Sequence, residues 1–76
     1  MTLTINGEER HFEREMTLAE LIEALGMKAD RVAVELNRNI AQRNQWAEMR
    51  LRDGDQLEIV HFVGGGDTQQ SGARDL

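Results

Sequence analysis

The sequence predicts an α+β domain in which a mixed sheet of four or five strands packs on one helix and leads into a flexible C-terminal tail. Short runs of alternating apolar and polar residues, separated by the turn dipeptides Asn6-Gly7 and Asp53-Gly54, indicate the strands. One segment has the apolar spacing of an amphipathic helix, and the polar, glycine-rich composition after residue 63 is typical of a segment that does not pack. A chain of 76 residues is long enough for one such core.

The first predicted element is a β-hairpin. Leu3 and Ile5 alternate with threonines, which predicts a half-buried strand. Asn6-Gly7 is the dipeptide best suited to a two-residue turn with positive φ. A second short strand is therefore expected from Glu8 to about Phe12.

A helix follows the hairpin. Thr17 and Glu20 have the spacing of a capping box, in which the two side chains satisfy amide groups at a helix start. Gly26 is suited to the left-handed conformation that ends a helix. Between them lies an apolar stripe at i, i+3, i+4 and i+7, formed by Leu18, Leu21, Ile22 and Leu25.

The second half of the chain predicts further strands. Alternation from Val32 to Leu36 predicts a third strand, and a final strand is expected from about Gln56 to Val63. Because one helix covers only one face of such a sheet, the other face should meet solvent or a partner. The segments between are expected to form a turn at 37–39, a brief continuation at 40–42, a short turn or single helical turn at 44–47, a short edge strand at 49–51 and a turn at 53–54.

The final strand has two faces with different roles. If Leu57 and Ile59 point into the core, Glu58, Val60 and Phe62 lie on the opposite face, and Phe62 is expected to be an exposed aromatic residue. Such a ring is either an ordinary partly covered apolar residue or, together with Val60, part of a docking patch. His61 falls on the core-side register near the strand end, where a structural or solvent-edge role is expected, and with only the distant His11 it does not suggest a metal site.

Composition narrows the function classes. The chain has no cysteine, which excludes a disulfide framework, a thiol nucleophile and the usual structural zinc or iron–sulfur sites. Nine basic residues are scattered among fourteen acidic ones, for a net charge of −5, which argues against nucleic-acid binding and favours basic partner surfaces. No secretory signal or apolar run long enough for a bilayer is visible, so a cytoplasmic location is expected.

Several strings, taken in order, resemble the sulfur carrier proteins of thiamine biosynthesis, the ThiS family of the β-grasp (ubiquitin-like) fold. They are "TINGEE", "TLAELIEALG", "VAVELNRNIAQRNQWAE", "LRDGDQLEIVHFV" and "VGGG", and the likeness runs from Thr2 to Gly66. The resemblance implies that Gly65 and Gly66 are the terminal pair that carries sulfur. It also implies that an E1-like (ThiF-like) enzyme adenylates the Gly66 carboxylate with ATP, and that a sulfur donor such as a cysteine desulfurase then converts it to a thiocarboxylate.

In such a family the thiocarboxylate serves a thiazole synthase (ThiG-like), so the chain is expected to be a carrier without catalytic residues or bound cofactor. Docking on the activating enzyme is expected to involve Glu58, Val60, Phe62, Val63 and Gly64. Three alternatives remain open: a carrier like the small subunit of molybdopterin synthase, a protein modifier joined to target lysines, and a binding module whose glycines are only a linker.

The chain departs from the family's pattern because it proceeds from Gly66 to Asp67. The expected organisation is a β-grasp domain at 1–63, a glycine tail at 64–66 and a disordered extension at 67–76. A precursor cut by a protease after Gly66 explains the extension; an expression-derived extension and an excerpt of a longer fusion are the alternatives.

Overall fold

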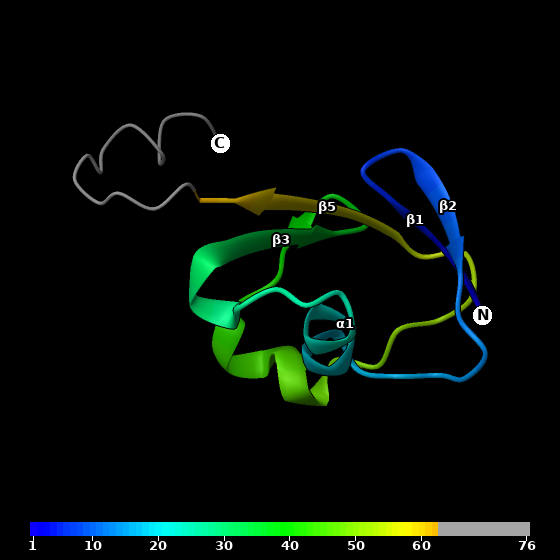
Figure 1. Ribbon diagram of the computed structural model, residues 1–76, viewed down its shortest axis with the longest axis horizontal. Helices are drawn as coiled ribbons and strands as arrows, with labels where there is room; N and C mark the ends of the chain where they lie inside the picture. The colour runs from blue at the N-terminus through cyan, green and yellow to red at the C-terminus, as the bar shows by residue number, and fades with distance from the viewer. Residues whose placement is uncertain (63–76) are drawn as a thin grey trace.

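A computed structural model describes residues 1–62, in which five strands form one sheet (Figure 1). The sheet has the order β2-β1-β5-β3-β4, so the first and last strands lie next to each other at its centre. β1 and β5 are parallel, and the other neighbouring pairs are antiparallel, which confirms the predicted mixed sheet. The elements in chain order, with η for 3₁₀ helices, are β1 (Thr2–Ile5), β2 (Glu8–His11), α1 (Leu18–Ala24), η1 (Ala29–Arg31), β3 (Val32–Leu36), β4 (Asn39–Ile40), η2 (Arg43–Glu48) and β5 (Gln56–His61).

Two tight turns with left-handed backbone connect the hairpins. Between β1 and β2, Asn6 and Gly7 have φ values of 52° and 84°, which confirms the predicted turn. Between β3 and β4, Asn37 and Arg38 have φ values of 51° and 74°. The second turn is therefore shorter than predicted, because Asn39 already pairs with β3 as the first residue of β4.

The helix α1 begins and ends as its sequence predicts. The Thr17 hydroxyl accepts a hydrogen bond from the Glu20 amide at 3.1 Å, and the Glu20 carboxylate accepts one from the Thr17 amide at 2.9 Å. At the other end Gly26 has φ +76°, and its amide donates to the Glu23 carbonyl, as in a Schellman motif. Both helix ends are thus fixed by local hydrogen bonds.

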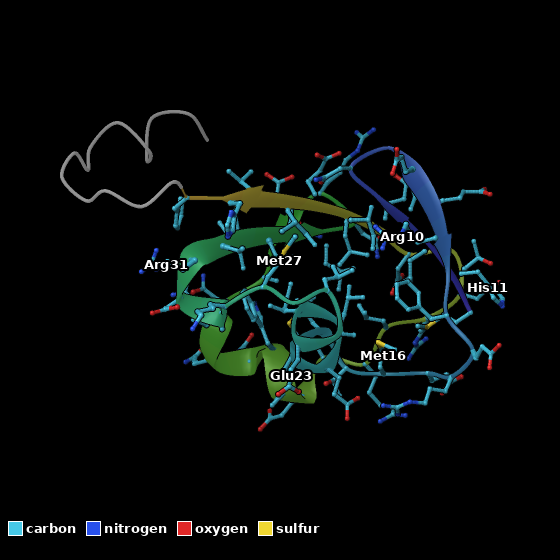
Figure 2. The ribbon with its side chains drawn as sticks, in the orientation of Figure 1. Arg10, His11, Met16, Glu23, Met27 and Arg31 are labelled. Atoms are coloured by element: carbon cyan, nitrogen blue, oxygen red, sulfur yellow. The ribbon has the colours of Figure 1, made fainter. Side chains whose placement is uncertain are left out.

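The core lies between the sheet and the layer that contains α1 and η2, both of which lie on the same side of the sheet (Figure 1). Full burial of each leucine or isoleucine side chain contributes about 1.5 to 3 kcal/mol to folding. Met16, labelled in Figure 2, is also buried on the helix side of the sheet. The buried hydrophobic residues are Leu3, Ile5, Met16, Leu18, Leu21, Ile22, Val32, Val34, Ala41, Trp46, Leu51, Leu57 and Ile59.

The loop before β5 differs from its prediction. Residues 49–51 form no strand; Arg50 makes an isolated bridge with Thr17, and Leu51 is buried with 1 % of its surface exposed. The Leu51 amide donates to the Met16 carbonyl at 3.0 Å, so this segment closes the core beside the start of α1 and does not extend the sheet. The segment around Trp46, expected to form a short turn or a single helical turn, is helical but longer, since η2 spans Arg43–Glu48.

Candidate functional site

The candidate site is the sheet face opposite α1, called here the outer face, together with the end of β5. Strand pairing fixes its members, because directly paired residues of neighbouring strands point to the same side. Figure 1 shows α1 on the other side of the sheet. The outer face carries Thr2, Thr4, Glu9, His11, Ala33, Glu35, Ile40, Gln56, Glu58 and Val60.

β5 is held from both sides by asparagine side chains. The Asn6 amide group donates to the Ile59 carbonyl at 3.1 Å and accepts from the Ile59 amide at 2.7 Å. On the opposite flank the side-chain Oδ1 of Asn37 accepts from the Gln56 backbone amide at 2.9 Å, and the side-chain Nδ2 of Asn37 donates to the Asp55 carboxylate at 3.0 Å. These bonds extend the pairing of β5 at points where its neighbours turn away, so the strand that leads to the tail is firmly positioned.

The end of β5 is fixed beside the start of β3. His61 pairs with Val32, and the Phe62 amide donates to the Arg31 carbonyl at 2.8 Å. Arg43 supports the same junction, since its guanidinium donates to the Ala29 carbonyl at 2.8 Å and to the Val32 carbonyl at 3.0 Å. The chain is therefore attached to the sheet up to residue 62.

The predicted docking residues fall partly on this surface. Leu57 and Ile59 point into the core with 2 % and 6 % exposure, as predicted, while Glu58 is exposed and Val60 half-buried on the outer face. Phe62 is half-buried, which matches the partly covered alternative and not a fully exposed aromatic residue. The bond to the Arg31 carbonyl keeps the backbone of residue 62 beside the start of β3.

His61 lies on the core-side register opposite Val32, as predicted, and is exposed at the strand end. β5 ends at His61, two residues earlier than expected. Val63, Gly64, Gly65 and Gly66 lie outside the described residues, as does the extension at 67–76.

Three outer-face residues were not singled out from the sequence. Ala33 pairs with Val60, and Glu35 pairs with both Glu58 and Ile40. Ile40 is 67 % exposed, and among the described residues it is the large hydrophobic side chain that stands out by its exposure. An isoleucine placed directly after a turn of polar residues was the available signal.

A shallow hollow of about 460 Å³ lies over these residues and is called here the outer groove. It is lined by Ala33, Val34, Glu35, Ile40, Glu58 and Val60. A second hollow, of about 480 Å³, adjoins it and shares Glu35 and Glu58 with it. The two carboxylates therefore stand between the hollows.

The described residues hold no cluster of three or more side chains suited to a metal ion. Within residues 1–62, no helix is long and apolar enough to cross a membrane. What the outer face offers is a mixed apolar and acidic surface, which suits contact with another protein better than catalysis.

Comparison with known sequences decides the family. The sequence model of the ThiS family matches residues 3–66, which is most of the chain and includes the glycine tail. The chain belongs to the ThiS family. Among curated relatives, the sulfur carrier protein ThiS of Bacillus subtilis is 35 % identical over 65 residues, which cover 84 % of this chain and 98 % of that protein.

The solved structures agree with this membership. The crystal structure of the thiamine biosynthesis protein ThiS from Geobacter metallireducens superimposes with a TM-score of 0.74 at 35 % identity, covering 87 % of this chain and all of that one. The β-grasp fold implied by the resemblance is thereby confirmed.

Other curated relatives are much longer. A thiazole synthase of Paramagnetospirillum magneticum is 48 % identical over 69 residues, which cover 91 % of this chain. This chain spans 21 % of that protein's length, and 20 % of a second thiazole synthase, from Magnetococcus marinus.

Proposed function

We propose that this chain is a sulfur carrier of thiamine biosynthesis whose reacting group is the carboxylate of Gly66. The observation that carries the proposal is the family match, which runs through the glycine tail to residue 66. Relatives named as ThiS sulfur carriers, from Bacillus subtilis and Escherichia coli, match over 98 % and 100 % of their own length. The likeness therefore covers a whole carrier and not only a shared sheet.

The proposed chemistry uses the chain as a co-substrate. Inside an E1-like adenylating enzyme the Gly66 carboxylate attacks the α-phosphorus of ATP and releases pyrophosphate, which leaves an acyl adenylate. The persulfide of a donor such as a cysteine desulfurase then attacks the acyl carbon and displaces AMP, which leaves an acyl disulfide. A thiol reductant cleaves the S–S bond of that disulfide and releases the thiocarboxylate. The carrier supplies no catalytic group, and the reaction is expected in the cytoplasm, where ATP is available.

Glycine suits the reacting end for a steric reason. Residues 64–66 have no Cβ atoms, so they fit a narrow channel and adopt backbone conformations closed to other residues. The four residues from 63 to 66 reach about 13 Å beyond Phe62 when extended. That length is enough to pass from a docking surface into a neighbouring active site.

Docking on the adenylating enzyme is assigned to Glu58, Val60 and Phe62, followed by Val63 and Gly64. The exposed Glu58 and the half-buried Val60 support this assignment, because both lie on the face that α1 leaves uncovered. Phe62 contributes the covered part of its surface to the fold and the remainder to the partner.

The proposed acceptor of the sulfur is a thiazole synthase. Support comes from two relatives of that name, each of which contains a segment similar to this chain. In such proteins a segment similar to the carrier and the enzyme that would accept its sulfur belong to one polypeptide.

Release of the Gly66 carboxylate is the step on which the proposal depends. While Gly66 is joined to Asp67 it has no carboxylate to activate, so we assign residues 67–76 to an extension that a protease removes. A chain ending at Gly66 should acquire a thiocarboxylate when incubated with the adenylating enzyme, ATP, a sulfur donor and a thiol reductant. Intact mass spectrometry would record the replacement of one oxygen by sulfur.

Two controls sharpen this experiment. The full-length chain should stay unmodified under the same conditions, and the shortened chain with Gly65→Ala and Gly66→Ala should lose most of its adenylation while folding normally. Sulfur loaded on the intact 76-residue chain would contradict the proposal. So would equal loading of the alanine variant, which would indicate that the glycines are only a linker.

A further inference from the structure

We propose that the outer groove receives a basic side chain, arginine or lysine, from the adenylating enzyme, with apolar groups of that enzyme packed around it. This inference rests on the proposed function and names the chemistry of the partner surface. The residues that form the receptor are Glu35 and Glu58 for the charge, and Ala33, Ile40 and Val60 for the apolar contact.

The acidic pair is the first step. Glu35 on β3 and Glu58 on β5 are direct partners in the strand register, so their side chains stand side by side on the outer face. Like charges placed directly opposite each other destabilise a sheet. The ion pair found within residues 1–62 joins Arg50 and Glu15 at 3.7 Å, which leaves the Glu35–Glu58 pair without a salt-bridge partner in the described part of the chain.

The position of this pair between two hollows is the second step. Glu35 and Glu58 line both the outer groove and the adjoining hollow. A cationic side chain that enters either hollow therefore meets both carboxylates. Arg38 also lines the adjoining hollow but forms no ion pair with either glutamate. Arg38 therefore leaves both carboxylates free to pair with a basic side chain of a partner.

The apolar part of the groove is the third step. Ala33 and Val60 are register partners, and Ile40 stands next to Glu35 from the edge strand β4. Ile40 is 67 % exposed, so most of its apolar surface is open to a partner. An apolar floor next to carboxylates matches the stem and head of arginine or lysine, whose methylene groups pack on apolar surface while the charge meets an acid.

Charge also decides which partner fits. A second copy of this chain would bring its own outer face, with the same two carboxylates, against Glu35 and Glu58. The net charge of −5 adds to that repulsion, so self-association is disfavoured and a basic partner is favoured. The length of the tail also suits the adenylating enzyme. The six residues from 61 to 66 span about 20 Å when extended, so an enzyme docked at Val60 could hold Gly66 in its own active site.

The test is a titration of the full 76-residue chain with the purified adenylating enzyme of the same organism, followed by calorimetry. The double variant Glu35→Gln with Glu58→Gln should weaken Kd about tenfold and reduce its salt dependence. Its unfolding midpoint should stay the same or rise, because the like-charge pair is removed. Ile40→Ala should weaken binding severalfold without the change in salt dependence.

The matched control is Glu13→Gln with Glu23→Gln, which removes the same charge from exposed positions away from the outer face; Glu23 lies on α1, as Figure 2 shows. It should bind as the unmodified chain does. A Kd for the Glu35 and Glu58 variant within twofold of the unmodified chain, or an equal loss in the control, would overturn the inference. The inference would also be overturned if the chain did not bind the adenylating enzyme at all, or if two copies of the chain formed a dimer that the Ile40→Ala substitution dissociates.

Failure of this inference is separable from failure of the proposed function. If the chain ending at Gly66 acquires a thiocarboxylate while the glutamine variant binds normally, the groove inference alone is wrong. If no thiocarboxylate forms on the shortened chain, the proposed function is wrong, whatever the affinities are.

Discussion

Asn6 is one of the two asparagines whose side chains hold β5, and replacing it tests how the sheet holds that strand. Asn6 makes two partly buried hydrogen bonds to Ile59, at 2.7 and 3.1 Å. Each contributes about 1 kcal/mol net, so their loss in Asn6→Gly should lower the free energy of unfolding by about 2 kcal/mol. Glycine adopts the φ of 52° without strain, so this variant isolates the hydrogen bonds from the turn geometry.

Asn6→Ala should cost more than Asn6→Gly. Alanine loses the same two bonds and also places a Cβ atom in the left-handed region, which adds about 1 to 2 kcal/mol. Arg38→Gly is the matched control, since Arg38 has φ 74° in the equivalent turn of the other hairpin. Its side chain makes none of the hydrogen bonds found within residues 1–62, so this change should be neutral or slightly stabilising.

Urea unfolding followed by far-ultraviolet circular dichroism gives the free energy of unfolding of each of the three variants. The values are compared with one common dependence of that free energy on urea concentration. Hydrogen exchange adds a local measurement, because the Ile59 amide should exchange faster in Asn6→Gly. If Asn6→Gly were as stable as the unmodified chain and Ile59 stayed protected, the side-chain bonds would not be what holds β5. If Arg38→Gly lowered the free energy of unfolding as much as Asn6→Gly does, the turn conformation would be responsible and not the hydrogen bonds of the Asn6 side chain.

Two further predictions concern the other side of the sheet. Thr17→Ala should lower the free energy of unfolding by about 1 kcal/mol, because it removes the N-cap bond to the Glu20 amide; an unchanged urea midpoint would show that Glu20 alone suffices. Trp46→Phe should cost about 1 to 3 kcal/mol, since the Trp46 indole donates to the Ala41 carbonyl at 2.9 Å in a buried position and phenylalanine leaves that carbonyl unpaired. Thermal unfolding followed by circular dichroism checks it, and a melting temperature equal to that of the unmodified chain would contradict it.

Local signals predicted the parts of the fold that depend on neighbouring residues. The Asn6-Gly7 turn and the Thr17–Glu20 capping box depend on interactions within four residues, and both are present as expected. The failures have a different cause. Leu51 lies in a segment with strand-like composition, yet burial beside Met16 and α1 decides its structure, and that contact is not visible in the local sequence.

The outer face was only half predictable. Alternation along β5 placed Glu58 and Val60 correctly, because period-two geometry holds inside a strand. Alternation left the exposure of Phe62 open between an exposed ring and a partly covered one, and the structure has this residue half-buried just after the strand end. Ile40 was not recognised because a strand of two residues is too short to show any alternation.

The chemistry of the glycine end came from a different kind of information. No periodicity marks Gly65 and Gly66 as reactive, and their proposed role rests on the resemblance; the family match shows the membership alone. Physical reasoning adds only why glycine is suitable there.

The arrangement of β5 has a consequence for the order of events in the proposed function. β5 is the central strand, paired with β1 on one side and β3 on the other and tied by Asn6 and Asn37, so the backbone is held in the sheet as far as residue 62. The sheet face left open beside β5 carries the outer groove. In the proposed function the adenylating enzyme and the sulfur acceptor both need Gly66, so they cannot engage it at the same time. Transfer between them therefore requires release from the first enzyme, which favours a surface of modest size with an exchangeable charge contact over a large apolar interface that dissociates slowly.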